Sequence, residues 1–329
     1  LGALAQVCEP ETKVIVIGHL NDIILYRELM NAGVSDYIVA PLNNLQFIEA
    51  IANLYSDPEA NPVGRVIAFA GAKGGVGSST IAHNIGWYIS KTFDVDTVIT
   101  DLDLAFGTAG LNFNNDGIQG IAEALAAAER IDQVLIDRLL TKCSEKLSLL
   151  LAPGSVEKEV SVETDTLQNI LDLVRASVPY VIADVPNVWM PWSKQTLMQA
   201  DEVVITATPE LASLRNTKNL IDFLKQARKN DGPPKLVMNQ VGMPKRPEVP
   251  VAKFAEAVGV KPSIVIKHDA QVFGTANSNG QMIFEVAAKS EAASNLVSLA
   301  QLLTGRQPSV KQSKLSLPFL SKLQDLRKK

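Results

Sequence analysis

The stretch GAKGGVGSST, residues Gly71–Thr80, predicts the architecture of most of this chain. An apolar run, Val66–Ala70, precedes it and a periodic apolar stretch, Ile81–Ile89, follows it, so its glycines lie at a turn from a strand into a helix. Glycine can adopt positive φ and lets backbone N–H groups approach an anion, while the helix directs its positive dipole end to the same point. We therefore expect a phosphate-binding loop; a glycine-rich turn without a ligand is the alternative.

The loop departs from the standard Walker A pattern, G-x-x-x-x-G-K-[ST]. Gly77 matches the second glycine and Ser79 matches the hydroxyl that binds a metal ion. Ser78 replaces the lysine of the pattern, and Ala72 replaces its first glycine. A lysine occurs instead at the start of the loop, as Lys73.

An early lysine in a K-G-G-x-G run resembles the deviant Walker loop of the ParA/MinD superfamily, and the ending Gly77–Thr80, GSST, is similar to its TadZ/CpaE pilus-assembly branch. This resemblance implies ATP and Mg²⁺ as cofactors. It also implies a homodimer in which Lys73 reaches the partner's nucleotide and acts as a catalytic residue. The residues expected to contact the nucleotide are Gly74, Gly75, Val76, Gly77, Ser78, Ser79, Thr80, Asn239, Lys267 and Asp269.

The composition of the 329 residues is that of an ordinary globular protein, with 47% hydrophobic and 20% charged residues. A net charge of −4 gives no overall reason to expect nucleic-acid binding. Cys8 and Cys143 lie far apart, without the spacing of metal ligands, and no apolar run is long enough to span a bilayer. We expect a cytoplasmic protein that has no signal peptide.

The beginning of the chain follows a βαβα pattern. Strands are expected at Lys13–Gly18 and Asp36–Val39, and helices at Asp22–Asn31 and Leu45–Tyr55. This order is typical of a parallel sheet.

The segment Arg27–Pro41, RELMNAGVSDYIVAP, resembles the last third of a response-regulator receiver domain. In that family a lysine precedes the proline, and Ala40 replaces it here. We interpret residues 1–57 as a partial, atypical receiver-like domain used for docking or dimerisation. Additional βα units of one large domain are the alternative. Turn residues without apolar periodicity mark residues 58–64 as a linker.

Residues 65–305 alternate short apolar runs with helical patterns. This predicts an α/β fold with a doubly wound, mainly parallel sheet, like that of P-loop NTPases, with helices on both faces. Such sheets bind ligands at the carboxyl ends of their strands. The expected strands are Arg65–Ala70, Thr97–Thr100, Leu147–Leu151, Tyr180–Ala183, Glu202–Ala207, Lys235–Asn239 and Ser263–Ile266.

Carboxylates follow two of these strands. Asp101 and Asp103 lie in DLDLAFGTAG, and Asp184 ends YVIAD. The two segments resemble switch I and switch II of the ParA/MinD superfamily, which implies that Asp103 orients the attacking water. It also implies that Asp101 and Asp184, together with Ser79, serve the Mg²⁺ ion. Helix N-caps or solvated turns are the alternative for the first two aspartates.

Two tryptophans, Trp189 and Trp192, follow the switch II-like segment. Packing in the core is one interpretation. A nucleotide-gated interface is the other, because aromatic side chains are enriched where interfaces bind most strongly.

Later strand ends provide candidates for a nucleoside pocket. Asn239 closes the strand KLVMN, where the superfamily uses an asparagine to read adenine, and an amide matches the donor and acceptor of that base. A turn-forming asparagine is the alternative. Ile266–Asp269 occupies the place of a turn that lines the base in relatives, which implicates Lys267 and Asp269. We expect His268 to be a surface residue.

The last 24 residues, 306–329, carry seven basic residues and one acidic residue, with leucine and phenylalanine interleaved. A basic amphipathic tail of this kind can lie on an anionic membrane or in the groove of a partner. A disordered, solvated terminus is the alternative.

The resemblance implies a protein whose nucleotide state governs homodimerisation and which organises a tight-adherence (Flp) type IV pilus machine at a cell pole. Its partners would be pilus and secretion proteins, not nucleic acid. We expect slow or absent ATP hydrolysis, because Ser78 carries no charge. An active ParA/MinD-type ATPase that positions another cargo is the main alternative, and a dinucleotide-binding oxidoreductase is the second.

Overall fold

The computed structural model describes residues 12–20, 22–40, 47–48, 50–51, 54, 63–115, 120–153, 157 and 160–306. The chain divides into two compact units, Leu1–Pro62 and Val63–Lys329, and each has its own sheet. The division falls inside the segment 58–64 that we expect to be a linker.

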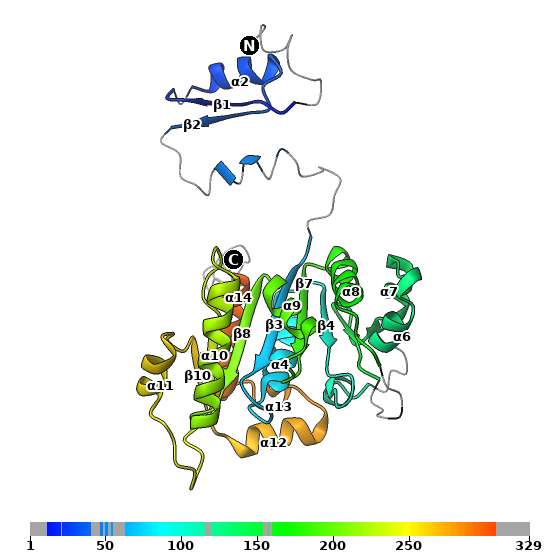
Figure 1. The fold of residues 1–329 in the computed structure, drawn as a ribbon, viewed down its shortest axis with the longest axis vertical. Coiled ribbons are helices and arrows are strands. Elements are labelled where there is room, and N and C mark those ends of the chain that lie inside the picture. The colour runs from blue at the N-terminus through cyan, green and yellow to red at the C-terminus, as the bar shows by residue number, and fades with distance from the viewer. Residues whose placement is uncertain are drawn as a thin grey trace, which may run out of the picture. The chain divides into compact units, whose positions relative to one another are not determined.

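The first unit contains two parallel strands connected by a helix (Figure 1). β1 (Ile15–Gly18) pairs with β2 (Asp36–Val39), and α2 (Ile23–Asn31) lies between them in the chain, as the pattern predicts. In the expected second helix, Leu45–Tyr55, residues 47, 48, 50, 51 and 54 are helical, and the others lie outside the described residues. The receiver-like interpretation stays a prediction.

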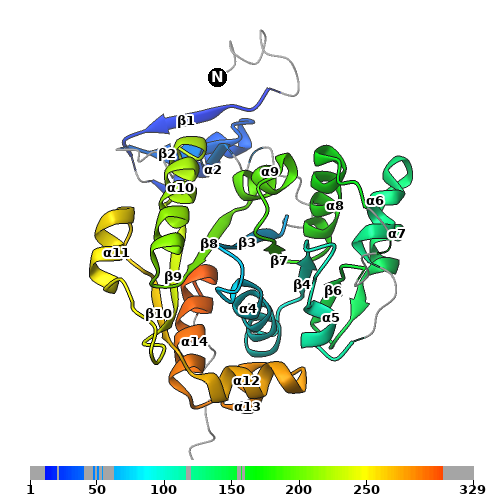
Figure 2. The ribbon, with the colours of Figure 1, turned by 60° about the horizontal axis from the view of Figure 1, so that its bottom comes forward.

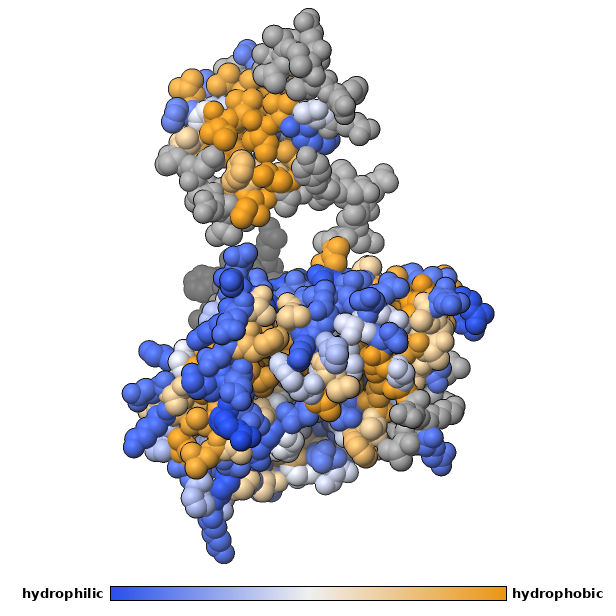
Figure 3. Space-filling model, viewed as in Figure 1, coloured by the Kyte–Doolittle hydropathy of each residue, from blue (hydrophilic) through white to orange (hydrophobic). Residues whose placement is uncertain are grey.

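The described surface of the first unit is rich in apolar side chains. In Figure 3 they cover most of the face that is visible, whereas polar residues are much more frequent on the second unit. The exposed apolar side chains include Ile17, Leu20, Phe47, Ile48 and Ile51. Patches of this kind commonly mark surfaces that contact another protein.

The second unit is built on one eight-stranded sheet with the order β10-β9-β8-β3-β7-β4-β6-β5. Its strands are β3 (Arg65–Gly71), β4 (Thr97–Asp101), β5 (Thr141–Lys142), β6 (Leu147–Leu150), β7 (Tyr180–Val185), β8 (Glu202–Ala207), β9 (Lys235–Val241) and β10 (Ile264–Lys267). Neighbouring strands are parallel, except that β5 pairs antiparallel with β6. This confirms the doubly wound, mainly parallel α/β sheet, to which the structure adds the short edge strand β5.

Helices cover both faces of this sheet (Figure 2). Alternate residues of β3 show the division, because Val66 and Ala68 belong to one buried core and Ile67 and Phe69 to the other. A strand that is buried on both faces reads as a continuous apolar run, which is why the sequence revealed it. The helices are α4 (Ser78–Thr92), α5 (Ala109–Asn112), α6 (Ile121–Ala126), η1 (Ala128–Arg130), α7 (Gln133–Leu139), α8 (Thr164–Ser177), α9 (Pro191–Gln199), α10 (Leu211–Ala227), α11 (Val251–Val258), α12 (Ala270–Asn279), α13 (Ile283–Val286) and α14 (Glu291–Thr304).

The strand order places the glycine-rich loop at the centre of the sheet. β3 lies between β8 and β7, and the next strand in the chain, β4, lies on the far side of β7. From β3 the chain thus continues toward one edge of the sheet, and it later returns to add β8, β9 and β10 on the other side of β3. At a reversal of this kind a crevice forms at the carboxyl ends of the strands, and ligands bind there in such folds. Asp101 of β4 and Asp184 of β7 are paired directly in register at this end.

Candidate nucleotide site

The turn between β3 and α4 has the backbone geometry of an anion-binding loop. Gly75 and Gly77 adopt positive φ, at 78° and 87°, whereas Gly74 does not use this freedom. A Cβ atom at Gly77 would lie 2.7 Å from Nδ2 of Asn239, so both the backbone conformation and the close approach favour glycine there. α4 begins at the next residue, Ser78, so its positive dipole end faces the loop.

Side-chain amides from other elements hold the carbonyl groups of this loop. The hydrogen bonds are Asn187 Nδ2 to the Gly71 oxygen at 2.8 Å, Asn216 Nδ2 to the Ala72 oxygen at 2.8 Å, Gln240 Nε2 to the Gly75 oxygen at 2.9 Å and Asn239 Nδ2 to the Val76 oxygen at 2.8 Å. In a trans peptide the N–H group points opposite to the carbonyl. The N–H groups of Val76 and Gly77 therefore point away from these amides and can face an anion.

The hydroxyl of Ser78 is available to a ligand of the loop. It is buried at the start of α4, and its Oγ atom has no hydrogen-bond partner. A buried polar group without a partner costs about 1–3 kcal/mol, so a ligand that bonds to this hydroxyl would be favoured. A phosphate oxygen would satisfy Ser78, and the residues present at this loop therefore fit a nucleotide.

Lys73 is held within its own chain in this structure. Its Nζ atom lies 3.3 Å from Oε2 of Glu210, which directly precedes α10, and both side chains are about a third exposed. The predicted contact of Lys73 with a partner's nucleotide requires this ion pair to open. That contact stays a prediction.

Asp101 and Asp103 organise the segment that follows β4. Both carboxylate oxygens of Asp101 accept backbone N–H groups, from Asp103 at 3.1 Å and from Ala109 at 3.0 Å, and Oδ1 of Asp103 accepts the N–H of Phe106 at 3.1 Å. These bonds stabilise the turn after β4, but Asp101 is buried, so a solvated turn does not describe it. The predicted roles of Asp101 and Asp103 toward the metal ion and the attacking water stay predictions.

Burial, together with the nearby Asp184 carboxylate, raises the pKa of Asp101 to about 6. The two acids lie at the ends of neighbouring strands, and Ser79 lies in the first turn of α4. Buried carboxylates beside a phosphate loop are suitable for the water shell of Mg²⁺, since this ion prefers oxygen ligands and retains several waters. Ser79, Asp101 and Asp184 would hold the ion, which would offset charge on the phosphates.

His83 is a site residue that our sequence reasoning missed. Its ring is fully buried, with Nε2 3.4 Å from Oδ2 of Asp184 and Nδ1 2.8 Å from Nδ2 of Asn112 in α5. The ring therefore connects the carboxyl end of β7 with the helix after the switch I-like segment. One signal was available: His83 follows Ser79 by four residues in α4, so both lie on the same face of that helix.

A cavity of about 420 Å³ adjoins the loop and gathers the residues expected around the nucleoside, including Asn239, Lys267 and Asp269. His268, which we expected at the surface, is half-buried and lines the cavity, and so does Met243, which we did not predict. One N–H of the Asn239 amide donates to the Val76 carbonyl, which leaves its oxygen and its second N–H for the donor and acceptor of adenine.

Lys267 and Asp269 have other partners in this structure. Lys267 lies 3.0 Å from Glu291, and Asp269 accepts the N–H of Val272 as the N-cap of α12. Their contact with the base stays a prediction.

The two tryptophans have different surroundings. Trp192 is partly buried and packs on the core, whereas Trp189 is about half exposed and meets Phe223 of α10 edge-on, with the ring centroids 5.1 Å apart. The core interpretation therefore applies to Trp192, and the nucleotide-gated interface stays a prediction for Trp189.

A phosphate loop after the central strand of a parallel sheet, with acids at the ends of the neighbouring strands, defines a P-loop nucleotide-binding protein. The AAA domain family matches residues 64–237, which is more than half of the chain. The chain belongs to this family, among the ATPases of the ParA/MinD type.

Known proteins support this assignment. The septum site-determining protein MinD of Bacillus subtilis is 24% identical over 185 residues, which cover 54% of this chain and 66% of that protein. The crystal structure of a ParA family ATPase from Chlorobium tepidum has a TM-score of 0.65 at 27% identity, covering 72% of this chain and 98% of that one. MinD of Pyrococcus horikoshii, solved with Mg-ADP, has the same fold, with a TM-score of 0.62 at 19% identity, covering 73% of this chain and 96% of that one.

The family match covers residues 64–237 and does not reach either end of the chain. The matched region spans about two thirds of the length of the Bacillus relative. Of the basic tail, 306–329, only Arg306 belongs to the described residues. In the described part of the chain, no helix has the length and apolarity needed to cross a membrane.

Proposed function

We propose that this protein binds ATP and Mg²⁺ and that the bound nucleotide governs its homodimerisation. The observation that carries the proposal is the buried, unpartnered hydroxyl of Ser78 in a loop whose carbonyl groups are held by side-chain amides. The solved relatives support ATP, since one is a complex of MinD with Mg-ADP and another is a complex of a Cyanothece McdA variant with ATP.

Each residue of the loop and of the neighbouring strand ends has a role in this function. The N–H groups of the loop and the hydroxyl of Ser78 bind phosphate oxygens, while Ser79, Asp101 and Asp184 hold the metal ion. Asp103 orients the attacking water. Lys73 leaves Glu210 and contacts the nucleotide bound by the second subunit.

Hydrolysis should be slow. In a standard loop a lysine at position 78 would offset the charge that develops on the transferred phosphate, and Ser78 offers only a neutral hydrogen bond. Losing one preorganised donor costs about 10² to 10³ in rate in other enzymes. A slow hydrolysis rate suits a switch that remains dimeric while ATP is bound.

In the cell, the protein would position a tight-adherence (Flp) type IV pilus machine at a cell pole. This finer assignment rests on the GSST ending of the loop, which is similar to the TadZ/CpaE branch. The exposed apolar side chains of the first unit would contribute to docking or dimerisation, and the basic tail would contact a membrane or a pilus protein. The test has two parts in the native cell: localisation of a fluorescent fusion, and the pili of a strain from which the gene is deleted. A diffuse fusion signal together with normal pili in the deletion strain would refute the pilus role.

The biochemical test is oligomer size by light scattering with ATP, ADP or no nucleotide, in the presence of Mg²⁺. We expect a dimer in the sample with ATP and a monomer in the samples with ADP or without nucleotide. Gly77→Val, which disrupts the loop, should remain monomeric with ATP. An equal size in all three conditions would contradict the nucleotide-gated dimer.

The main alternative is an active ATPase that positions another cargo, which the likeness to MinD favours. Turnover of about 1 to 10 per second, typical of many enzymes, would support it over the slow switch. A dinucleotide-binding oxidoreductase is less well supported, and a thermal shift with NAD but not with ATP would be required to revive it.

A further inference from the structure

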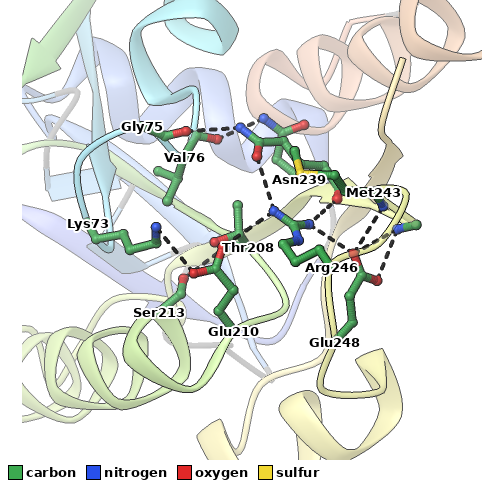
Figure 4. A network of polar contacts seen from close by, with 12 residues as sticks. Lys73, Gly75, Val76, Thr208, Glu210, Ser213, Asn239, Met243, Arg246 and Glu248 are labelled. Carbon is green, nitrogen blue, oxygen red and sulfur yellow. Dashed lines mark hydrogen bonds and ion pairs between the residues drawn. The ribbon is translucent and has the colours of Figure 1, made fainter. Parts of the chain in front are cut away.

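A partly buried arginine connects the elements that surround the phosphate loop. Arg246 lies between β9 and α11, and its side chain is only 16% exposed. Its Nη1 atom lies 3.3 Å from Oε1 of Glu210 and 3.3 Å from Oε1 of Gln240. Its Nη2 atom donates to the backbone carbonyl of Gln240 and lies 2.9 Å from Oε1 of Glu248 (Figure 4).

One branch of this network reaches Gly75 through a strained residue. Gln240 has φ of 55°, a left-handed conformation that residues other than glycine adopt rarely and at a cost. Arg246 binds this residue at both its backbone carbonyl and its side-chain oxygen. In this conformation, Nε2 of Gln240 donates to the Gly75 carbonyl at 2.9 Å. The strain is therefore located where a side chain supports the phosphate loop.

A second branch reaches Lys73 through Glu210. The two oxygens of this carboxylate are divided between two cations, with Oε1 at 3.3 Å from Arg246 and Oε2 at 3.3 Å from Lys73. Arg246 thereby fixes the orientation of the carboxylate that Lys73 contacts. Both cations belong to this chain, so the pair is complete in one subunit.

Glu248 fixes the arginine itself. Its oxygens accept the N–H groups of Gly242 at 3.0 Å and of Met243 at 3.1 Å, which closes the loop that carries Arg246. These bonds lower the pKa of Glu248, although burial opposes the shift. The guanidinium is thus anchored on one side and contacts the supports of the phosphate loop on the other.

We propose that Arg246 is a positioning residue of the nucleotide site: it holds Gln240 against Gly75 and Glu210 against Lys73, which prepares the loop to receive a nucleotide. Arg246 acts through these residues and does not itself contact the phosphates. The inference rests on the proposed binding of ATP.

The experiment is titration calorimetry with Mg-ATP on the full chain. Arg246→Met should bind about tenfold more weakly than the parent, since a hydrogen bond to a charged group is worth at least that factor. Arg228→Met is the matched control, because Arg228 is similarly buried, at 8% exposed, with Asp231 at 2.8 Å and the Leu197 carbonyl at 3.0 Å, outside the loop's contacts. It should lose thermal stability but bind ATP within about twofold of the parent.

Two further variants separate positioning from a general loss of packing. In the Gln240→Gly variant, glycine can adopt the positive φ of this position without strain, but the amide that bonds to Gly75 is lost, so ATP binding should also weaken. Adding Arg246→Met to Gln240→Gly should cause little further loss of ATP affinity. Arg246→Lys keeps the charge without the forked geometry and should recover part of the affinity. If Arg246→Met does not fold, Gln240→Gly alone tests the branch to Gly75.

The outcomes are distinct. If the parent binds ATP and either Arg246→Met or Gln240→Gly binds equally well, the positioning role is refuted and the proposed function stands. Equal losses in Arg246→Met and Arg228→Met, or full additivity of the double variant, would also refute it. If the parent produces no heat with Mg-ATP, both proposals fail.

Discussion

Gly77 offers the sharpest test of the loop geometry, because two separate costs arise when it is replaced by alanine. At φ of 87°, an alanine would have to adopt a left-handed conformation, which costs about 1–2 kcal/mol. The new Cβ atom would lie 2.7 Å from Nδ2 of Asn239 and displace this buried amide from the Val76 carbonyl. Loss of that hydrogen bond costs roughly a further 1–3 kcal/mol.

Alanine also lowers the conformational entropy of the unfolded chain, which stabilises the folded state by roughly 0.4–1 kcal/mol. Gly77→Ala should therefore lower the free energy of unfolding by about 1 to 5 kcal/mol and abolish ATP binding. The assay is urea unfolding without nucleotide, followed by ATP titration at a temperature where the variant is folded.

Gly74→Ala is the matched control from the same loop. Gly74 does not have positive φ, and a Cβ atom there would meet no other atom within 4 Å. The free energy of unfolding of the Gly74→Ala variant should remain within about 1 kcal/mol of that of the parent. Equal stability of the Gly77→Ala variant and the parent, or an equal loss in both variants, would refute this reasoning.

Three other changes test the site. Ser78→Lys should accelerate ATP hydrolysis at least severalfold, measured by phosphate release; an unchanged rate would show that the missing lysine is not limiting. Lys73→Ala should weaken ATP-dependent dimerisation more than ATP binding, and an equal loss of both, by light scattering and calorimetry, would place the lysine in its own chain's site. Asp101→Asn should alter the pH dependence of stability. Since the folded pKa of Asp101 is raised to about 6, its contribution to stability is complete below about pH 4 and is lost as the pH rises to about 6. The parent should therefore lose on the order of 3 kcal/mol relative to the variant over this window, and a constant difference in urea unfolding would contradict the shift.

The sequence predicted the fold because the relevant signals are local. β3, β7 and β8 are buried on both faces, so each appears as a short apolar run between turn residues or helices. β5 was missed because a strand of two residues, Thr141–Lys142, has too little pattern to recognise. Its antiparallel pairing at the edge of the sheet depends on its neighbour β6.

The order of glycines, the position of Ser78 and the acids at the strand ends are properties of the sequence itself. They were sufficient to predict a phosphate loop between a strand and a helix of a mainly parallel sheet, because glycine conformation and strand periodicity act between near neighbours. The contacts that support this loop are of another kind. Asn216 lies 144 residues from Ala72, and Asn239 lies 163 residues from Val76. Only the tertiary packing decided that α10 and β9, which is separated from β3 by β8, bring these amides to the loop. It also decided that Glu210 holds Lys73 and that His83 of α4 meets Asp184 of β7. Side-chain partners so distant in the chain depend on the register of the whole sheet, which no local pattern records.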